Sequence, residues 1–185
     1  MAIATPRGVA RLQAVFRGQR SRKLHVERVK KNLAWAPFVP CSLEAAQAML
    51  HLANVSSDDV VLDIGCGDGR VVFEAIKPPF SAKQAIGVDI DPALVAQCQR
   101  SPQATDKTTF ILDDWIHIDM SHVTVITLFF LPHESIARLL AQKCRPGTRV
   151  VTYVFSIQEW TPQMTATTVP FLKESGNSPL FLYYV

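Results

Sequence analysis

Three aspartates, Asp63, Asp89 and Asp114, stand where short predicted strands end and have the side chains best suited to hold a ligand. Asp63 could accept hydrogen bonds from a cationic amine or orient the amides of the loop that follows it. Asp89 could accept from both hydroxyls of a ribose, and Asp114 from an exocyclic amine such as that of adenine. Singly, each carboxylate could equally be a helix cap or a solvated loop acid. Together at successive strand ends they predict a ligand with a cationic amino-acid end, a ribose and an adenine.

A glycine-rich loop, Gly65-Cys66-Gly67-Asp68-Gly69, follows the first of these strands. Glycine lets the backbone turn tightly and pass close to a ligand. A dinucleotide-binding loop would have glycine at position 70, where this chain has Arg70, and a P-loop would have Gly-Lys-Ser/Thr, which is absent here. Asp63 and Asp68 are also poor neighbours for a diphosphate. The loop therefore favours a ligand without phosphate. A ligand with a cationic amino-acid end, a ribose and an adenine but no phosphate is S-adenosylmethionine.

Strands and helices alternate along the chain, which predicts an α/β fold with a doubly wound, mainly parallel sheet of seven strands. The predicted strands are 60–64, 85–89, 108–112, 123–131 and 148–155, with two further candidates at 165–169 and 180–185. The predicted helices are 42–52, 70–76, 91–100 and 133–144. Ligands of such sheets bind outside the carboxyl ends of the strands. This is where the three aspartates are expected to meet.

Composition indicates a globular intracellular protein. Of the 185 residues, 48% are hydrophobic and 19% are charged, as in ordinary globular domains. The longest strongly apolar run, Val123–Leu131, is far shorter than the roughly 20 residues that a membrane-spanning helix needs, so no membrane span is expected. The four cysteines form no CxxC pair and have no metal-ligand spacing with the histidines. We therefore expect reduced thiols and no metal.

Charge divides the chain into a basic arm, residues 1–35, and a mildly acidic domain, residues 36–185. The arm has nine Lys or Arg and one acid, Glu27, whereas the domain has ten Lys or Arg and 15 Asp or Glu. An acidic domain argues against nucleic acid as the partner. The arm matches the IQ pattern bound by calmodulin-like proteins at Leu12-Gln13, Arg17-Gly18 and Arg22. It equally fits an Arg-rich mitochondrial transit peptide or a solvated helix covering a sheet edge, which leaves mitochondrion and cytoplasm both open.

The glycine loop and its flanks resemble the first motif of the class I methyltransferases. More narrowly, the chain from Ala36 onward resembles the small protein-lysine methyltransferases of mitochondrial inner-membrane proteins, which in eukaryotes act on the adenine nucleotide translocase and the c subunit of ATP synthase. The matching segments, in the same order, are 37–40, 63–70, 87–92, 114–115, 119–121, 127–132 and 160–162.

The resemblance implies which residues bind the cofactor: Phe38, Pro40, Asp63, Gly65, Cys66, Gly67, Asp89, Ile90, Asp114 and Trp115. Phe38 and Pro40 would fold over it, and Trp115 would lie near the adenine. The chain departs from the family at Cys66, where Ser is commoner, and it lacks the hydrophobic membrane segment that usually precedes this domain.

Methyl transfer is an in-line displacement that needs no metal, so alignment and desolvation can supply most of the catalysis. A lysine acceptor has a reference pKa of about 10.4 and must lose its proton first, either in a slot of low dielectric or to a carboxylate or carbonyl. The slot is expected after the fourth predicted strand, and its candidates are Phe130, Leu131, Pro132, His133 and Trp160. No general base is assigned, since His133 could simply begin a helix, and Trp160 could pack beside Pro162.

The sequence thus predicts an S-adenosylmethionine-dependent methyltransferase that modifies a protein lysine. The alternatives are a small-molecule N- or O-methyltransferase and a non-catalytic S-adenosylmethionine-binding module. The absence of inserted substrate-binding elements favours an open site and a large acceptor. The identity of the acceptor, the number of methyl groups transferred and the oligomeric state stay open at this point.

Overall fold

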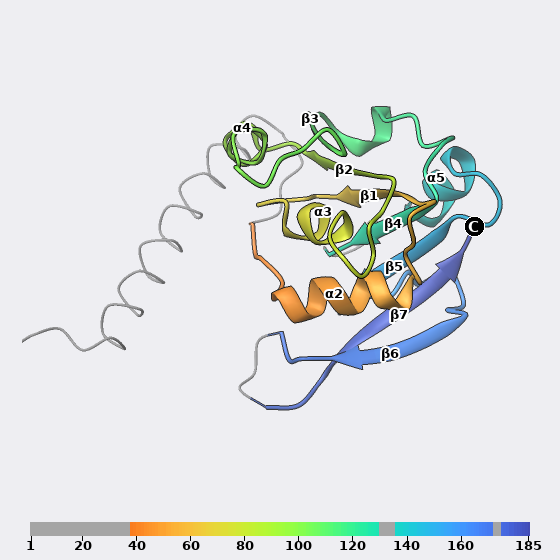
Figure 1. Ribbon diagram of the computed structural model, residues 1–185. Helices are drawn as coiled ribbons and strands as arrows, with labels where there is room; N and C mark the ends of the chain where they lie inside the picture. The colour runs from red at the N-terminus through yellow and green to blue at the C-terminus, as the bar shows by residue number, and fades with distance from the viewer. Residues whose placement is uncertain (1–37, 130–135, 172–174) are drawn as a thin grey trace, which may run out of the picture. The chain divides into compact units, whose positions relative to one another are not determined.

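The structure is a computed structural model that describes residues 38–129, 136–171 and 175–185. The chain divides into two compact units, Met1–Val39 and Pro40–Val185, and the second contains every helix and strand described below (Figure 1). The predicted arm, residues 1–35, and the slot candidates Phe130, Leu131, Pro132 and His133 lie outside the described residues.

The second unit is built on a seven-stranded sheet with the order β3-β2-β1-β4-β5-β7-β6. Its strands are β1 Val60–Ile64, β2 Gln84–Asp89, β3 Thr108–Leu112, β4 Val125–Leu128, β5 Arg149–Tyr153, β6 Met164–Thr168 and β7 Ser178–Tyr184. Strands β1 to β5 pair in parallel, and β7 is antiparallel to both β5 and β6. The predicted doubly wound, mainly parallel sheet is confirmed. The strand order reverses at β1 and β4, where such sheets bind ligands.

Four described helices and one short 3₁₀ helix connect these strands: α2 Leu43–Leu52, α3 Arg70–Ala75, α4 Pro92–Gln99, η1 Trp115–His117 and α5 Ile136–Lys143. Two of them begin at the side-chain caps that the sequence predicts. The Ser42 Oγ accepts from the Ala45 amide, and the Asp91 side chain accepts from the amides at the start of α4. These caps satisfy amides that have no partner within the helix.

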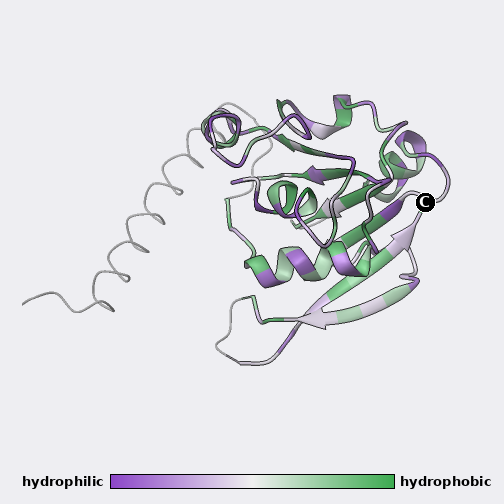
Figure 2. Cartoon of the chain, viewed as in Figure 1, coloured by the Kyte–Doolittle hydropathy of each residue, from purple (hydrophilic) through white to green (hydrophobic). Residues whose placement is uncertain are grey.

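Each face of the sheet carries its own apolar core. Helices α2, α3 and α4 contribute Met49, Val72 and Val95 to the first core cluster, which covers one face. Helix α5 contributes Leu140 to the second core cluster, which covers the other. Figure 2 shows the central strands mostly in the colour of hydrophobic residues and β6 mostly pale. The central strands are thus buried from both sides, as their continuous apolar runs predict.

The predicted fourth strand, 123–131, is longer than the observed β4, Val125–Leu128. At its start, the Thr124 hydroxyl donates to Asp59 Oδ1 and accepts from the Val60 amide. At its end, pairing stops at Leu128 because β1 turns into the glycine loop after Ile64. Phe129 continues the apolar run beside Tyr153 of β5 but lies outside β4, and residues 130 and 131 of the predicted strand lie outside the described residues.

A buried group of hydrogen bonds around Asp59 joins several segments at the amino edge of the sheet. Asp59 is 4% exposed and accepts from the Ser56 amide at 2.8 Å and from the Thr124 hydroxyl at 2.7 Å. Arg149 of β5 pairs with Asp59 and also donates to the carbonyls of Ala53 and Asn54, just after α2. Burial alone would raise the pKa of Asp59, but these hydrogen bonds and the charge of Arg149 hold that pKa below its usual value.

Among the residues that the structure describes, no helix is long and apolar enough to cross a membrane.

Candidate functional site

The amides of the glycine loop are held by the end of β2. The Gly65 and Cys66 amides donate to the Val88 carbonyl at 2.9 and 3.1 Å. The Gly67 amide donates to Asp89 Oδ2 at 2.9 Å. Gly65 and Gly67 have φ values of 74° and 56°, the region that favours glycine. Because these amides are already bonded, they do not form the nest of N–H groups that a diphosphate needs.

Asp89 joins the glycine loop to the start of α4. Its Oδ2 accepts from Gly67, and its Oδ1 accepts from the Asp91 amide at 2.9 Å. A carboxylate oxygen has room for a second hydrogen bond, so Asp89 can hold the loop and still accept from a ligand. This dual arrangement was not predictable from the spacing of the residues.

Asp63 is a carboxylate buried beneath the same edge of the sheet. Its side chain is 5% exposed, and the buried Thr127 hydroxyl of β4 donates to its Oδ1 at 2.7 Å. The pKa of Asp63 is raised to about 7, mainly by burial and to a smaller extent by the nearby charges of Asp89 and Asp68. The hydrogen bond from Thr127 acts in the opposite direction and lowers this pKa. A bound cation would favour the ionised form. Sequence reasoning missed Thr127, although a hydroxyl inside an apolar strand was a usable signal.

The glycine loop packs directly against the residues behind it. A Cβ at Gly69 would lie 2.9 Å from the Phe110 ring and 3.0 Å from Cys98 Sγ, and a Cβ at Gly87 would lie 2.8 Å from Cys66 Sγ. Such contacts leave no room for a side chain at either glycine. The Cys66 side chain is buried in this packing, so any contact of Cys66 with a ligand would come from its backbone.

The third aspartate, Asp114, lies beyond the end of β3. Pairing of Asp89 with Leu112 brings the ends of β2 and β3 to the same level, so Asp63, Asp89 and Asp114 follow neighbouring strands at one edge. Asp114 Oδ1 also accepts from the Ile116 amide at 3.1 Å and caps η1, a helix that the sequence did not predict.

The remaining predicted site residues differ in how directly the structure places them. Ile90 is exposed, and Trp115 packs partly buried against the second core cluster. Trp160 packs against the same cluster, with its ring centre 5.9 Å from that of Tyr183. Pro40 is exposed at the start of the second unit. Phe38 belongs to the first unit, so its predicted place over the cofactor stays a prediction.

An arginine links the start of α2 to the glycine loop. Arg70 donates from Nε to Asp68 Oδ1 at 2.9 Å and pairs with Asp68 through Nη2. Its Nη1 donates to the Cys41 carbonyl. Burial, together with the charge of Asp63, raises the pKa of the Cys41 thiol to about 12. Arg70 thus connects Cys41, in the segment before α2, to Asp68 of the glycine loop.

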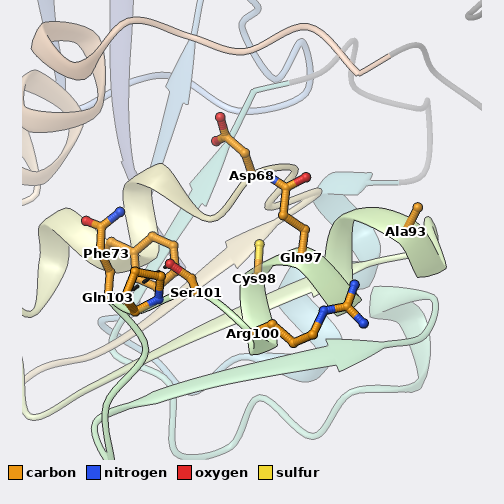
Figure 3. A pocket seen from close by; sticks show the side chains of 9 residues that line it. Asp68, Phe73, Ala93, Gln97, Cys98, Arg100, Ser101 and Gln103 are labelled. Atoms are coloured by element: carbon orange, nitrogen blue, oxygen red, sulfur yellow. Dashed lines mark hydrogen bonds between the residues drawn. The ribbon is translucent and has the colours of Figure 1, made fainter.

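A cavity of about 630 Å³ lies beside the loop, along α4 and the residues that follow it (Figure 3). Asp68, Phe73, Cys98 and Gln103 are among the residues that line it. The three strand-end aspartates are not part of its lining. It is therefore distinct from the site at the strand ends. Among the described residues, no group of three or more His, Cys, Asp or Glu side chains could hold a metal ion.

Comparison with solved structures shows to which class of enzyme the fold belongs. A crystal structure described as an RNA methyltransferase from Salinibacter ruber in complex with S-adenosyl-L-homocysteine matches with a TM-score of 0.69 and 30% identity, covering 79% of this chain and 93% of that one. The fold and the strand-end site define a class I methyltransferase that uses S-adenosylmethionine as the methyl donor.

Comparison of sequences gives the family. Residues 63–164 match the family model of the ANTKMT methyltransferase domain, and the chain belongs to that family. A protein-lysine N-methyltransferase of Saccharolobus islandicus is 35% identical over 132 residues, which are 69% of this chain and 81% of that protein. The lysine N-methyltransferase of the ATP synthase c subunit from Xenopus laevis is 27% identical over 68% of this chain. The chain spans only 56% of the length of this second relative.

Proposed function

We propose that this methyltransferase transfers a methyl group to the side-chain amine of a protein lysine. The observation that carries the proposal is the 35% identity to a protein-lysine N-methyltransferase, of which the match covers 81%. RNA is the second candidate acceptor, since the Salinibacter ruber methyltransferase is 30% identical. The excess of acids in residues 36–185 disfavours RNA, because nucleic-acid binding relies on basic surfaces.

The strand-end aspartates would orient the methyl donor. In this proposal Asp63 receives the amino group of S-adenosylmethionine, Asp89 its ribose hydroxyls and Asp114 its adenine. The donor supplies a methyl group on a sulfonium. The positions of the three carboxylates at neighbouring strand ends support this assignment, as does a glycine loop whose amides are already bonded. Ile90, Trp115 and the Pro40–Cys41 segment would contribute further contacts.

The affinity for S-adenosylmethionine is expected to rise with pH up to about pH 7. The buried Asp63 has a pKa raised to about 7, and only its ionised form attracts a cationic amine. Below pH 7 the cofactor must displace a proton, so the Kd is expected to increase up to tenfold per pH unit. Calorimetry in two buffers of different ionisation enthalpy should detect proton release at pH 6.5.

The Asp63→Asn variant serves as the control for this titration. Its neutral amide oxygen can still accept from Thr127, so the local hydrogen bond is kept. It should bind the cofactor weakly and with no pH dependence in this range. A wild-type affinity that is constant from pH 5.5 to 7 would contradict the assignment of Asp63.

The proposed function is tested by transfer of labelled methyl from S-adenosylmethionine into a fractionated cell extract, with Asp89→Ala as the inactive control. Label in a protein band, recovered as methyl-lysine and absent with the variant, is the expected result. Label confined to RNA or to small molecules would replace the lysine proposal with the corresponding methyltransferase. Cofactor binding without any label would favour the binding-module alternative.

The basic arm, residues 1–35, bears on where the protein is located in the cell and on which protein it binds. Likeness to the methyltransferases of the ATP synthase c subunit supports a mitochondrial location, with the arm as the transit peptide. The IQ-like pattern supports a calmodulin-like partner as the alternative role of the arm. Both concern residues outside those that the structure describes.

A further inference from the structure

Three aromatic rings from separate segments meet next to the proposed cofactor site. The ring centres of Phe129 and Tyr153 are 4.8 Å apart, and those of Phe129 and Phe171 are also 4.8 Å apart, nearly perpendicular at 87°. Tyr153 and Phe171 are 6.0 Å apart. Phe129 follows β4, Tyr153 ends β5, and Phe171 lies in the connection from β6 to β7. We call these three rings the aromatic trio.

The aromatic trio lies on the same face of the sheet as the buried carboxylate. Phe129 comes two residues after Thr127, whose hydroxyl binds Asp63. Side chains two residues apart in an extended chain point to the same face, about 7 Å apart along it. Tyr153 belongs to the first core cluster, and Phe129 and Phe171 pack against that cluster. The trio thus stands one step beyond Asp63 toward the carboxyl edge.

The polar atoms around the rings are bonded within the protein. The Tyr153 hydroxyl donates to the Val169 carbonyl at 3.2 Å, and the Phe171 amide donates to Ser178 Oγ at 2.9 Å. Tyr153 is 1% exposed, whereas Phe129 and Phe171 are only half-buried. What the trio offers to a ligand is therefore the ring surface of Phe129 and Phe171, which pack on the buried Tyr153, and not hydrogen bonds.

The backbone after Tyr153 is held in an uncommon conformation. Val154 has a φ of 69°, and the Phe155 amide donates to the Tyr153 carbonyl at 2.9 Å, which closes a tight turn. A β-branched residue adopts positive φ only under strain, which the surrounding structure must hold in place. The turn directs the chain away from the sheet immediately beyond the trio.

We propose that Phe129 and Phe171, packed on the buried Tyr153, form the wall of the methyl-acceptor slot and select a lysine amine by excluding water around it. This inference rests on the proposed function. Ring faces attract the ammonium form on entry, and exclusion of water favours its neutral form. The ammonium proton passes to solvent water. The nitrogen lone pair then forms the N–C bond as the S–C bond breaks, and sulfur keeps the bonding electron pair.

A slot of this kind should show itself in the pH dependence of the rate. The rings lower the pKa of the bound amine from its free value of about 10.4, so the rate should rise with pH through that lowered value. The titratable groups described around the trio are Asp63 on β1, the Cys41 thiol before α2 and Tyr153 itself. Measurements between pH 8 and 10 keep Asp63 ionised throughout, because its pKa is about 7.

The test uses Phe129→Leu and Phe171→Leu in the full chain, with the extract protein that the wild type labels as the acceptor. Each variant should lose about tenfold in initial rate at pH 8 with saturating cofactor. The loss should shrink toward pH 10, because water admitted to the slot moves the amine pKa upward. The Kd for S-adenosylmethionine should stay within about twofold.

The matched control is Phe181→Leu. Phe181 is also half-buried and lies on β7, but it packs against the second core cluster on the opposite face. It should keep both the rate and its pH profile. Unchanged rate profiles in Phe129→Leu and Phe171→Leu, or parallel losses of cofactor affinity, would overturn the inference. A wild-type protein that labels no lysine would instead refute the proposed function.

Discussion

Replacement of Asp89 by alanine is expected to weaken S-adenosylmethionine binding about 100-fold and to reduce methyl transfer at least as much. Asp89 accepts from the Gly67 and Asp91 amides, so the variant loses the bonds that shape the glycine loop and the start of α4. It also loses the proposed acceptor for the ribose hydroxyls. Hydrogen bonds to a charged group contribute about 1.5–3 kcal/mol each, and about 2.7 kcal/mol corresponds to a factor of 100.

Calorimetric titration of each variant with S-adenosylmethionine measures this effect. Asp58→Ala is the matched control, because Asp58 is an exposed aspartate just before β1, at the opposite edge of the sheet. It should bind as the wild type does. The affinity of Asp89→Asn for S-adenosylmethionine should fall between those of Asp89→Ala and the wild type. Its side-chain amide keeps one acceptor oxygen but turns an NH₂ donor toward one of the two backbone amides. Binding by Asp89→Ala within threefold of the wild type would refute the assigned role.

Replacement of Asp59 by alanine is expected to lower the free energy of unfolding by about 3–5 kcal/mol, the cost typical of breaking a buried ion pair. Asp59 accepts hydrogen bonds from Ser56 and Thr124 and pairs with Arg149. Without the carboxylate, the Arg149 guanidinium and the Thr124 hydroxyl lose their partner in a largely buried place. Because the folded-state pKa of Asp59 is lowered, its contribution is present at neutral pH and lost as the pH falls through that value.

Urea denaturation at pH 7 provides the measurement, and the midpoint of Asp59→Ala should fall clearly. The neighbouring Asp58→Ala should change the free energy of unfolding by less than about 0.5 kcal/mol, as surface substitutions do. Combining Asp59→Ala with Arg149→Met should cost less than the sum of the two single changes, because the second change removes the uncompensated charge. Strict additivity would show that the two side chains act independently.

The strands were predictable because their apolar runs are short and bounded by turn residues. The bounds of β1 and β3 match the predicted 60–64 and 108–112. Among the described residues, the fourth strand was predicted to begin two residues too early and to include Phe129, because periodicity reports burial and not pairing. The η1 helix was missed because three residues leave no periodic signal.

Co-location of the strand-end aspartates was also predictable, since parallel strands place their carboxyl ends at one edge. The contacts made by those residues were not. The bond from Thr127 to Asp63 and the approach of Phe171 to Phe129 join segments far apart in the chain. Such contacts depend on sheet order and on the antiparallel return of β7, which local patterns do not encode.

The hydrogen bonds around Asp59 also have a consequence for how the molecule opens. They join the end of α2, β1, β4 and β5 at the amino edge, far along the strands from the cofactor site. Amide hydrogens of β1 and β4 should therefore exchange with deuterium only through global unfolding, whereas those of the edge strand β6 should exchange through local fraying. Local unfolding can then occur at the carboxyl edge of the sheet, where ligands bind, while the amino edge stays folded.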